Sequence, residues 1–360
     1  MILIFLSTGL IFLITSCANM VAPTGGDKDI SPPQIQSIII LDNEKSEYSK
    51  TLIFEFDEYI QLNRWDEYFY ISPTIKKRAQ KIIKGKKLFL TIEDTLNRNT
   101  NYYTVLNRCI KDNNEGNILD TLSYNFSIND SYDTLILSGS LLDAYALSSI
   151  ENAWVMLFNE DVNDTNIFNQ TPHYIAKTDK NGFFNFPNLK DINYKIVALT
   201  DFDFFYDKQE KIAFSERIVN ARIDSFISLF GFDPIIEFDS IITDSLEREL
   251  ELDTSNSIIQ DSFASGTLEI ILNKDTPSIF QLLQNEKVIM EISFSEKPYL
   301  IDPIEPGEYQ LKYIVDANED NIWNTGNWEM KMQPEKVVNY PSEIIIRSNW
   351  DLQLEWIISE

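Results

Sequence analysis

The segment TLIFEFDEYI, Thr51 to Ile60, decides the fold class of the first part of this chain. Leu52, Phe54 and Phe56 fall at every second position, and acidic residues stand between them or just after them. Successive side chains of an extended strand point to opposite faces, so this alternation is typical of a half-buried β-strand. The segment therefore predicts a β-sheet with one apolar face.

Similar patterns surround this segment. KKLFLTIED (86–94) alternates in the same way, and NYYTVLNRCI (101–110) and LSYNFSI (122–128) read as further strands separated by KDNNEGNILD (111–120), a turn rich in Asn, Asp and Gly. No long amphipathic helix interrupts them. We therefore predict an all-β fold that begins with a β-sandwich over residues 34–131.

Six pieces in order resemble a known family: PTGGDKDISPP (23–33), FEFDEYIQL (54–62), YISP (70–73), LNRNTNYYTVL (96–106), IKDNNEGN (110–117) and NFSI (125–128). Together they resemble the bacterial Ig-like domain named after the SbsA surface-layer protein. The combination with an upstream cysteine is similar to lipoproteins of the Bacteroidota, in which this domain follows an acylated cysteine.

Residues 132–231 form a second strand-rich segment. It runs from DTLILSGSLLDA (133–144) through TDKNGFF (178–184), a turn carrying Gly182 between two alternating strands. This segment resembles the carboxypeptidase-regulatory or transthyretin-like seven-strand sandwich, a domain that is itself non-catalytic.

The acidic residues 232–262 lack regular alternation and predict a linker or long loop. A third strand-rich segment, residues 263–360, begins at GTLEIILN (266–273) and ends with NWDLQLEWII (349–358). Segments two and three share a spacing, because Tyr194 stands seven residues before Asp201 and Tyr309 seven before Asp316. We therefore expect the third segment to be a β-sandwich related to the second.

Residues 1–16, MILIFLSTGLIFLITS, are uncharged and shorter than the roughly 20 residues of a bilayer-spanning helix. Their length favours a signal peptide. With Cys17 directly behind them, the segment resembles a bacterial lipobox, although no Lys or Arg precedes the apolar run. The resemblance implies cleavage before Cys17, a lipid on its thiol, a tether over residues 17–33 and, with Ala18 following, sorting to the outer membrane. An ordinary signal peptide or short anchor with an incidental cysteine is the alternative.

The charge balance excludes one class of partner. Asp and Glu total 56 against 30 Lys and Arg, a net charge of −26. Nucleic-acid phosphates need basic partners, so we expect no nucleic-acid binding. His173 is the single histidine, which argues against His-rich metal sites and most general-base chemistry. Cys109 is expected inside a strand as an unreactive core thiol, and no catalytic residue is assigned.

The candidate metal site is DANEDNIWNTGN, residues 316–327. Asp316, Asn318, Asp320 and Asn324 supply oxygens at spacings that calcium can use. The stretch departs from an EF-hand loop, because Asn321 stands where glycine is wanted and no Glu closes the loop. The other interpretation is a polar inter-strand loop with Trp323 packed on the sandwich.

The corresponding turn of the second segment supplies four acidic side chains among phenylalanines, and we interpret it as a solvated acidic loop. These are Asp201, Asp203, Asp207 and Glu210.

These observations favour a non-enzymatic outer-membrane lipoprotein, facing the periplasm or the cell surface. We expect it to act as a docking subunit for outer-membrane β-barrel proteins or their assembly or secretion machinery. The alternative is a surface adhesin or glycan-binding module, calcium-dependent through the Asp316 loop, with Trp323 and Trp328 stacking on sugars. No other cofactor is expected.

Overall fold

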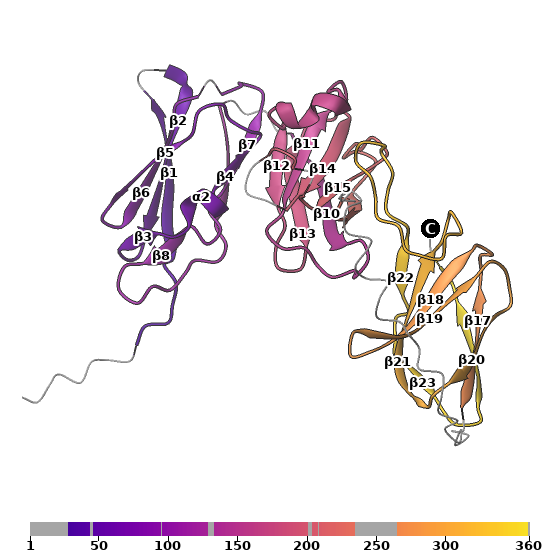
Figure 1. Cartoon of the computed structure of the whole chain (residues 1–360). Helices are drawn as coiled ribbons and strands as arrows, with labels where there is room; N and C mark the ends of the chain where they lie inside the picture. The colour runs from indigo at the N-terminus through magenta and orange to yellow at the C-terminus, as the bar shows by residue number, and fades with distance from the viewer. Residues whose placement is uncertain are drawn as a thin grey trace, which may run out of the picture.

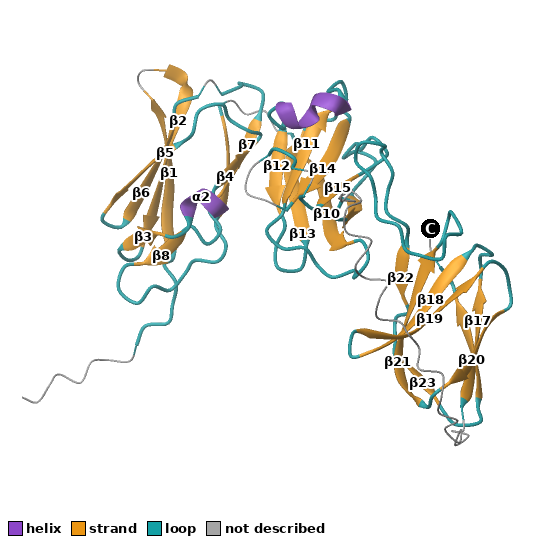
Figure 2. Ribbon diagram, viewed as in Figure 1, coloured by secondary structure: helices purple, strands orange, loops and turns teal. Residues whose placement is uncertain are grey.

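The computed structural model describes residues 28–43, 46–94, 96–128, 133–200, 204–207, 209–234 and 265–358. The predicted signal peptide, Cys17 and most of the acidic 232–262 segment lie outside these residues. The described chain is nearly all β-structure, arranged as β-sandwich modules that follow one another, which confirms the predicted fold class (Figures 1 and 2). None of the described helices is both long and apolar enough to cross a bilayer.

The first module contains strands β1 to β9 and one short helix. The elements are β1 (Ile35–Asn43), β2 (Ser46–Phe56), β3 (Ile60–Leu62), α2 (Trp65–Tyr68), β4 (Tyr70–Ser72), β5 (Gln80–Lys84), β6 (Lys87–Ile92), β7 (Asn101–Val105), β8 (Ile110–Asp112) and β9 (Ser123–Ser127). A sheet in the order β1-β2-β6-β5 faces a sheet in the order β4-β7-β9, and β3 pairs with β8.

The predicted alternation forms the core of this module. The apolar side chains at every second position of β2 and β6 are fully buried, and they are Leu52, Phe54, Phe56, Leu88, Leu90 and Ile92. One prediction was wrong in detail. NYYTVLNRCI is not a single strand, because a turn at Arg108, with φ of 57°, separates β7 from β8 and leaves Cys109 just before β8.

The second module contains β10 to β16 and a short 3-10 helix. The elements are β10 (Leu135–Asp143), β11 (Trp154–Asn159), η1 (Asp164–Asn169), β12 (Tyr174–Lys177), β13 (Phe183–Leu189), β14 (Tyr194–Leu199), β15 (Ile212–Phe214) and β16 (Phe226–Gly231). The sheets are β13-β10-β16 and β12-β11-β14-β15. Gly182 has φ of 76° in the turn before β13, as a tight turn between strands requires.

The third module contains β17 to β24. The strands are β17 (Gly266–Leu272), β18 (Ser278–Gln284), β19 (Lys287–Phe294), β20 (Tyr299–Ile304), β21 (Gly307–Val315), β22 (Val337–Asn339), β23 (Ile344–Ile346) and β24 (Asp351–Trp356). The sheets are β20-β17-β24 and β19-β18-β21-β22, with β23 paired to β21.

The second and third modules share one strand order. In each, the first strand pairs antiparallel with the fourth and parallel with the last, as β10 does with β13 and β16, and β17 with β20 and β24. The Tyr194 hydroxyl donates to the carbonyl oxygen of Lys190 at 3.2 Å, and the Tyr309 hydroxyl to that of Glu305 at 2.8 Å. Each tyrosine thus ties its strand to the loop four residues upstream.

The chain leaves the second module one residue later than expected. Phe232, the first residue of the predicted linker, is 1% exposed and exchanges two backbone hydrogen bonds with Ile212. It therefore belongs to the core of the second module.

Candidate functional site

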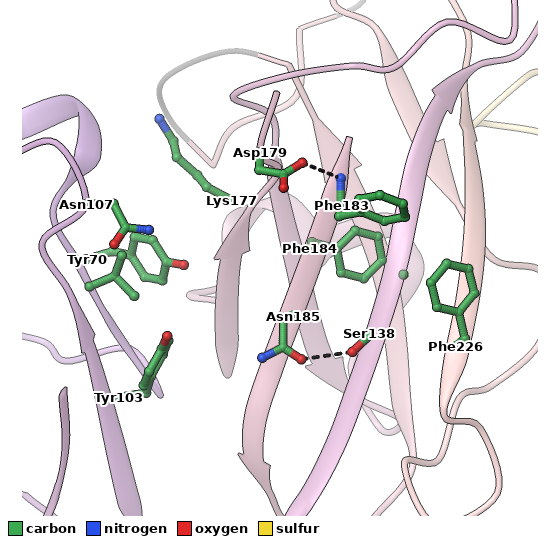
Figure 3. Close-up of a pocket in the computed structure, with 12 residues that line it drawn as sticks. Tyr70, Tyr103, Asn107, Ser138, Lys177, Asp179, Phe183, Phe184, Asn185 and Phe226 are labelled. Atoms are coloured by element: carbon green, nitrogen blue, oxygen red, sulfur yellow. Dashed lines mark hydrogen bonds between the residues drawn. The ribbon is translucent and has the colours of Figure 1, made fainter. Parts of the chain in front are cut away.

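A groove of about 390 Å³ lies between the first and second modules (Figure 3). Tyr70 and Tyr103 reach it from the first module, and Phe183 and Phe226, each 51% exposed, line it from the second. Asp179 is the one carboxylate among the described residues that line the groove. It accepts the backbone N–H groups of Asn181 and Phe183. The groove therefore combines aromatic side chains with polar ones, and its described lining holds no pair of carboxylates for acid–base chemistry.

The direct contact between these two modules is held by hydrogen bonds that involve backbone groups. Ser72 Oγ accepts the N–H of Ile175 at 3.2 Å, and the Thr74 N–H donates to the carbonyl of His173 at 3.0 Å. Lys177 Nζ donates to the carbonyl of Glu67 at 2.7 Å and lies 4.7 Å from the centre of the Trp154 ring. Strand β12 thereby rests against β4.

A second cavity, of about 350 Å³, opens beside this contact. Its lining includes Trp65 and Phe69, whose rings stack at 4.3 Å, together with Phe204 and Trp154 of the second module. Trp154 is 5% exposed, and its Nε1 has no hydrogen-bond partner among the described residues. The first junction therefore combines hydrogen bonds between the modules with a groove and a cavity that both contain aromatic side chains.

The predicted metal loop lies at the second junction. Residues 316–336 extend from the third module toward the second, as Figure 1 shows in yellow-orange between β22 and β15. Trp323 packs on Tyr145 at 5.0 Å, and Trp328 packs on Phe168 and Phe214 at 5.2 and 5.1 Å. Both tryptophans are half-buried, so this loop joins two modules and its aromatic faces are largely used by that contact.

The four predicted calcium ligands come together within this loop. Asp316 is 2% exposed, and its carboxylate accepts the N–H groups of Asp320 and Asn321. The Asp320 carboxylate accepts the N–H of Ile322 and the side-chain amides of Asn318 and Asn324. These bonds lower the pKa of Asp320, the Ile322 N–H contributing most. Both carboxylates therefore already have partners from the protein.

One oxygen of this set is left over. Asn324 Oδ1 is buried and has no donor among the described residues. The described part of the chain holds no cluster of three or more His, Cys, Asp or Glu side chains that could hold a metal. Calcium binding through Asp316, Asn318, Asp320 and Asn324 stays a prediction.

Glu335 is the residue of this loop that the sequence did not reveal. Its carboxylate accepts the N–H groups of Ala317 and Asn324, and its carbonyl accepts Nε1 of Trp323. Burial is the main reason why the pKa of Glu335 is raised. It stands 11 to 19 residues after the four candidate ligands, beyond the reach of a local spacing rule.

The remaining candidates are dispersed. Asp201 and Asp203 lie outside the described residues, whereas Glu210 is buried and its N–H donates to Asp207. His173 lies just before β12, where burial lowers its pKa. Cys109 is fully buried, and burial raises its thiol pKa to about 12, which makes it a poor nucleophile.

Comparison with known proteins supports part of this architecture. Residues 29–128 match the family model described as a bacterial Ig-like domain, so the first module is a domain of that family. No curated protein matches the chain.

Several solved structures align with the chain at low similarity. The minor pilin GBS52 of Streptococcus agalactiae is 13% identical, with 62% of this chain and 95% of that one covered and a TM-score of 0.21. BcpA, the major pilin subunit of Bacillus cereus, is 11% identical over 55% and 69%, with a TM-score of 0.18. A structure of native alpha-2-macroglobulin from Escherichia coli that spans domains MG0-NIE-MG1 is 10% identical, with 79% of this chain and 94% of that one covered and a TM-score of 0.21. Scores this low carry no argument about function.

Proposed function

We propose that this protein is a non-enzymatic outer-membrane lipoprotein that serves as a docking subunit. Its partners would be integral outer-membrane β-barrel proteins or the machinery that assembles or secretes them. A lipid on Cys17 would hold it to the membrane, and its β-sandwich modules would present their surfaces to the partner.

The observation that carries this proposal is the construction of the two junctions. A fixed arrangement of the modules requires contacts between them. At each of the two junctions, buried polar groups of neighbouring modules form hydrogen bonds with one another. Ser72 meets Ile175 at the first junction, and Gln281 Nε2 donates to the Tyr145 hydroxyl at 2.8 Å at the second. A buried polar group that loses its partner destabilises a fold by about 1–3 kcal/mol, so these contacts favour one arrangement of the modules. A row of modules held in one arrangement is suited to present its surfaces to a partner in a defined geometry.

The linings of the groove and the second cavity also support a docking function. The groove and the second cavity of the first junction both carry aromatic side chains, and the lining of the second cavity is mostly apolar, which suits these surfaces to bind partner side chains. The net charge of −26 opposes contact with anionic lipid, which favours an arm that stands away from the bilayer surface.

The experiment is extraction from native membranes in mild detergent, followed by co-purification and mass spectrometry. We expect a stable complex containing a β-barrel protein, and a diacylglyceryl-modified Cys17 at the mature N-terminus. A Cys17→Ala variant should lose both the lipid and the complex, whereas the matched Cys109→Ala variant should keep both. Recovery of the wild-type protein as a lone monomer in every mild detergent would contradict the proposal.

A further inference from the structure

The repeat within the chain exposes a difference between its two related modules. In the second module the two sheets are closed at one side, where Ile212 of β15 and Phe232, just after β16, exchange backbone hydrogen bonds of 3.0 and 2.9 Å. The last strand of that module is therefore joined on one side to β10 and tied at its end to β15.

The third module is open at the corresponding side. Within the described residues β24 pairs with β17 alone, and no pairing joins it to β22 or β23. The chain after β24 is held on the side of β17. The side chain of Asn273, the residue after β17, accepts the N–H of Ile358 at 2.9 Å and donates to its carbonyl at 3.2 Å. The free edge of β24 thus remains a strand edge without a neighbour in this part of the chain.

A cavity of about 380 Å³ lies along this edge, between β23 and β24. Its apolar lining comes from the inward-facing side chains of β24, Leu352 and Leu354, and from Tyr340 and Ile344 opposite. At one end Trp350 is 60% exposed, with the Arg347 guanidinium 5.3 Å from its ring centre. The edge is therefore accompanied by a row of partly exposed apolar groups.

We propose that the free edge of β24 binds an extended segment of a partner protein in which apolar and basic residues alternate. This inference rests on the proposed docking function and names the surface and the kind of partner. An added strand would continue the β20-β17-β24 sheet through main-chain hydrogen bonds. Every second side chain of the segment would enter the cavity beside Leu352 and Leu354.

The charge of β24 defines the other half of the segment. Asp351, Gln353 and Glu355 are exposed and alternate with the inward-facing residues. Residues opposite one another on neighbouring strands interact directly, and opposite charges stabilise the pair. Basic side chains on the outward face of the added strand would therefore lie beside Asp351 and Glu355. An acidic segment would be repelled there.

The test is binding of synthetic peptides to the full chain, followed by fluorescence anisotropy. The probe is an eight-residue peptide in which isoleucine and lysine alternate, capped at both ends. One comparison peptide has glutamate in place of lysine, and another has four isoleucines followed by four lysines. We expect the alternating basic peptide to bind at least about tenfold more tightly than either of the others.

A charge-reversal variant makes the assignment specific. In Asp351→Lys/Glu355→Lys the preference should invert, so that the glutamate peptide binds more tightly than the lysine peptide. The matched control, Glu151→Lys/Asp161→Lys, changes the net charge equally at exposed sites of the second module and should keep the original preference. A Leu354→Arg variant should lose binding of both peptides.

Three outcomes would overturn the proposal: equal binding of the block and alternating basic peptides, unchanged preference in Asp351→Lys/Glu355→Lys, or no binding at all. The failure of the docking function itself would look different. If a membrane complex is recovered equally from wild type and from Asp351→Lys/Glu355→Lys, docking stands and this edge is not its site. If no complex is recovered while the peptide preference inverts as expected, the edge stands without the membrane partner.

Discussion

The side-chain amine of Lys312 lies 4.2 Å from the centre of the Tyr145 ring and donates a 3.0 Å hydrogen bond to the carbonyl oxygen of Tyr145. Lys312 belongs to β21 of the third module, and Tyr145 to the turn after β10 of the second. Lys312 is 6% exposed, and its burial lowers the pKa of the amine. One residue of the second module thus satisfies a buried cation of the third, which makes this pair the centre of the second junction.

We predict that Tyr145→Ala weakens this junction by about 1–3 kcal/mol, because the buried Lys312 loses the ring and Gln281 loses the hydroxyl. Urea unfolding followed by tryptophan fluorescence measures the loss. Tyr145→Phe, which removes only the hydroxyl, should cost less. Tyr59→Ala, at a 60% exposed site of the first module, is the control and should leave unfolding of the third module unchanged.

Gly326 of the Asp316 loop packs closely against Phe232 of the second module. A Cβ atom at this position would lie 2.6 Å from ring atoms of Phe232. We predict that Gly326→Ala displaces the ring and destabilises the junction by about 1–3 kcal/mol, as overpacking in a filled core does. Limited proteolysis should then cleave the 316–336 loop faster. Ile322→Ala, at a 60% exposed site of the same loop, should change the unfolding free energy by less than about 0.5 kcal/mol, and an equal effect of both changes would contradict the packing argument.

Lys331 gives this junction a dependence on pH. Its amine lies over the Trp328 ring, and burial lowers its pKa to about 8 from the usual 10.5, an effect that Asp164 partly opposes. The unfolded chain holds this proton up to about pH 10.5, so between about pH 8 and 10.5 the unfolded state binds more protons. The contribution of Lys331 to stability is therefore complete above that range and is lost as the pH falls through about 8.

We accordingly expect the wild type to gain stability relative to Lys331→Met when the pH rises from about 7 to about 10. Lysine side-chain NMR should place the midpoint of this amine near pH 8. A Lys331 midpoint near 10.5 would contradict the burial of this side chain.

The Asp316 loop is predicted to keep its fold without calcium. Its two carboxylates already accept backbone and amide N–H groups, so a metal would have to displace bonds that exist. Weak extracellular calcium sites are filled at about 1 mM calcium. We expect that concentration to shift the melting temperature by less than about 1 °C. A larger shift that is absent from Asp320→Ala but retained in Asp207→Ala would establish a calcium site.

Much of the fold could be predicted from local patterns. The alternation of Leu52, Phe54 and Phe56 produced a fully buried strand face, and the shared spacing of Tyr194 and Tyr309 marks the same corner in two modules with one strand order. Period-two alternation survives folding because the side-chain direction in a strand follows from backbone geometry alone.

The junctions could not be predicted in this way. The pairs Lys312–Tyr145 and Ser72–Ile175 join residues 167 and 103 positions apart, and no spacing rule relates them. The loop bearing Asp316 resembled a metal site because Asx residues serve both ligands and turns. Its role in contacting the second module depends on Trp328, whose neighbours Phe168 and Phe214 come from another module.

Cross-linking in living cells, combined with protease shaving of the cell surface, tests the central claim most directly. A membrane-permeant amine cross-linker should join the wild-type protein to an integral outer-membrane β-barrel protein, and the Cys17→Ala variant should not be joined. The sensitivity of that product to the added protease reports which side of the membrane the modules face. A wild-type protein that is never cross-linked to an outer-membrane protein, or one cross-linked equally without Cys17, would contradict a lipid-held docking arm.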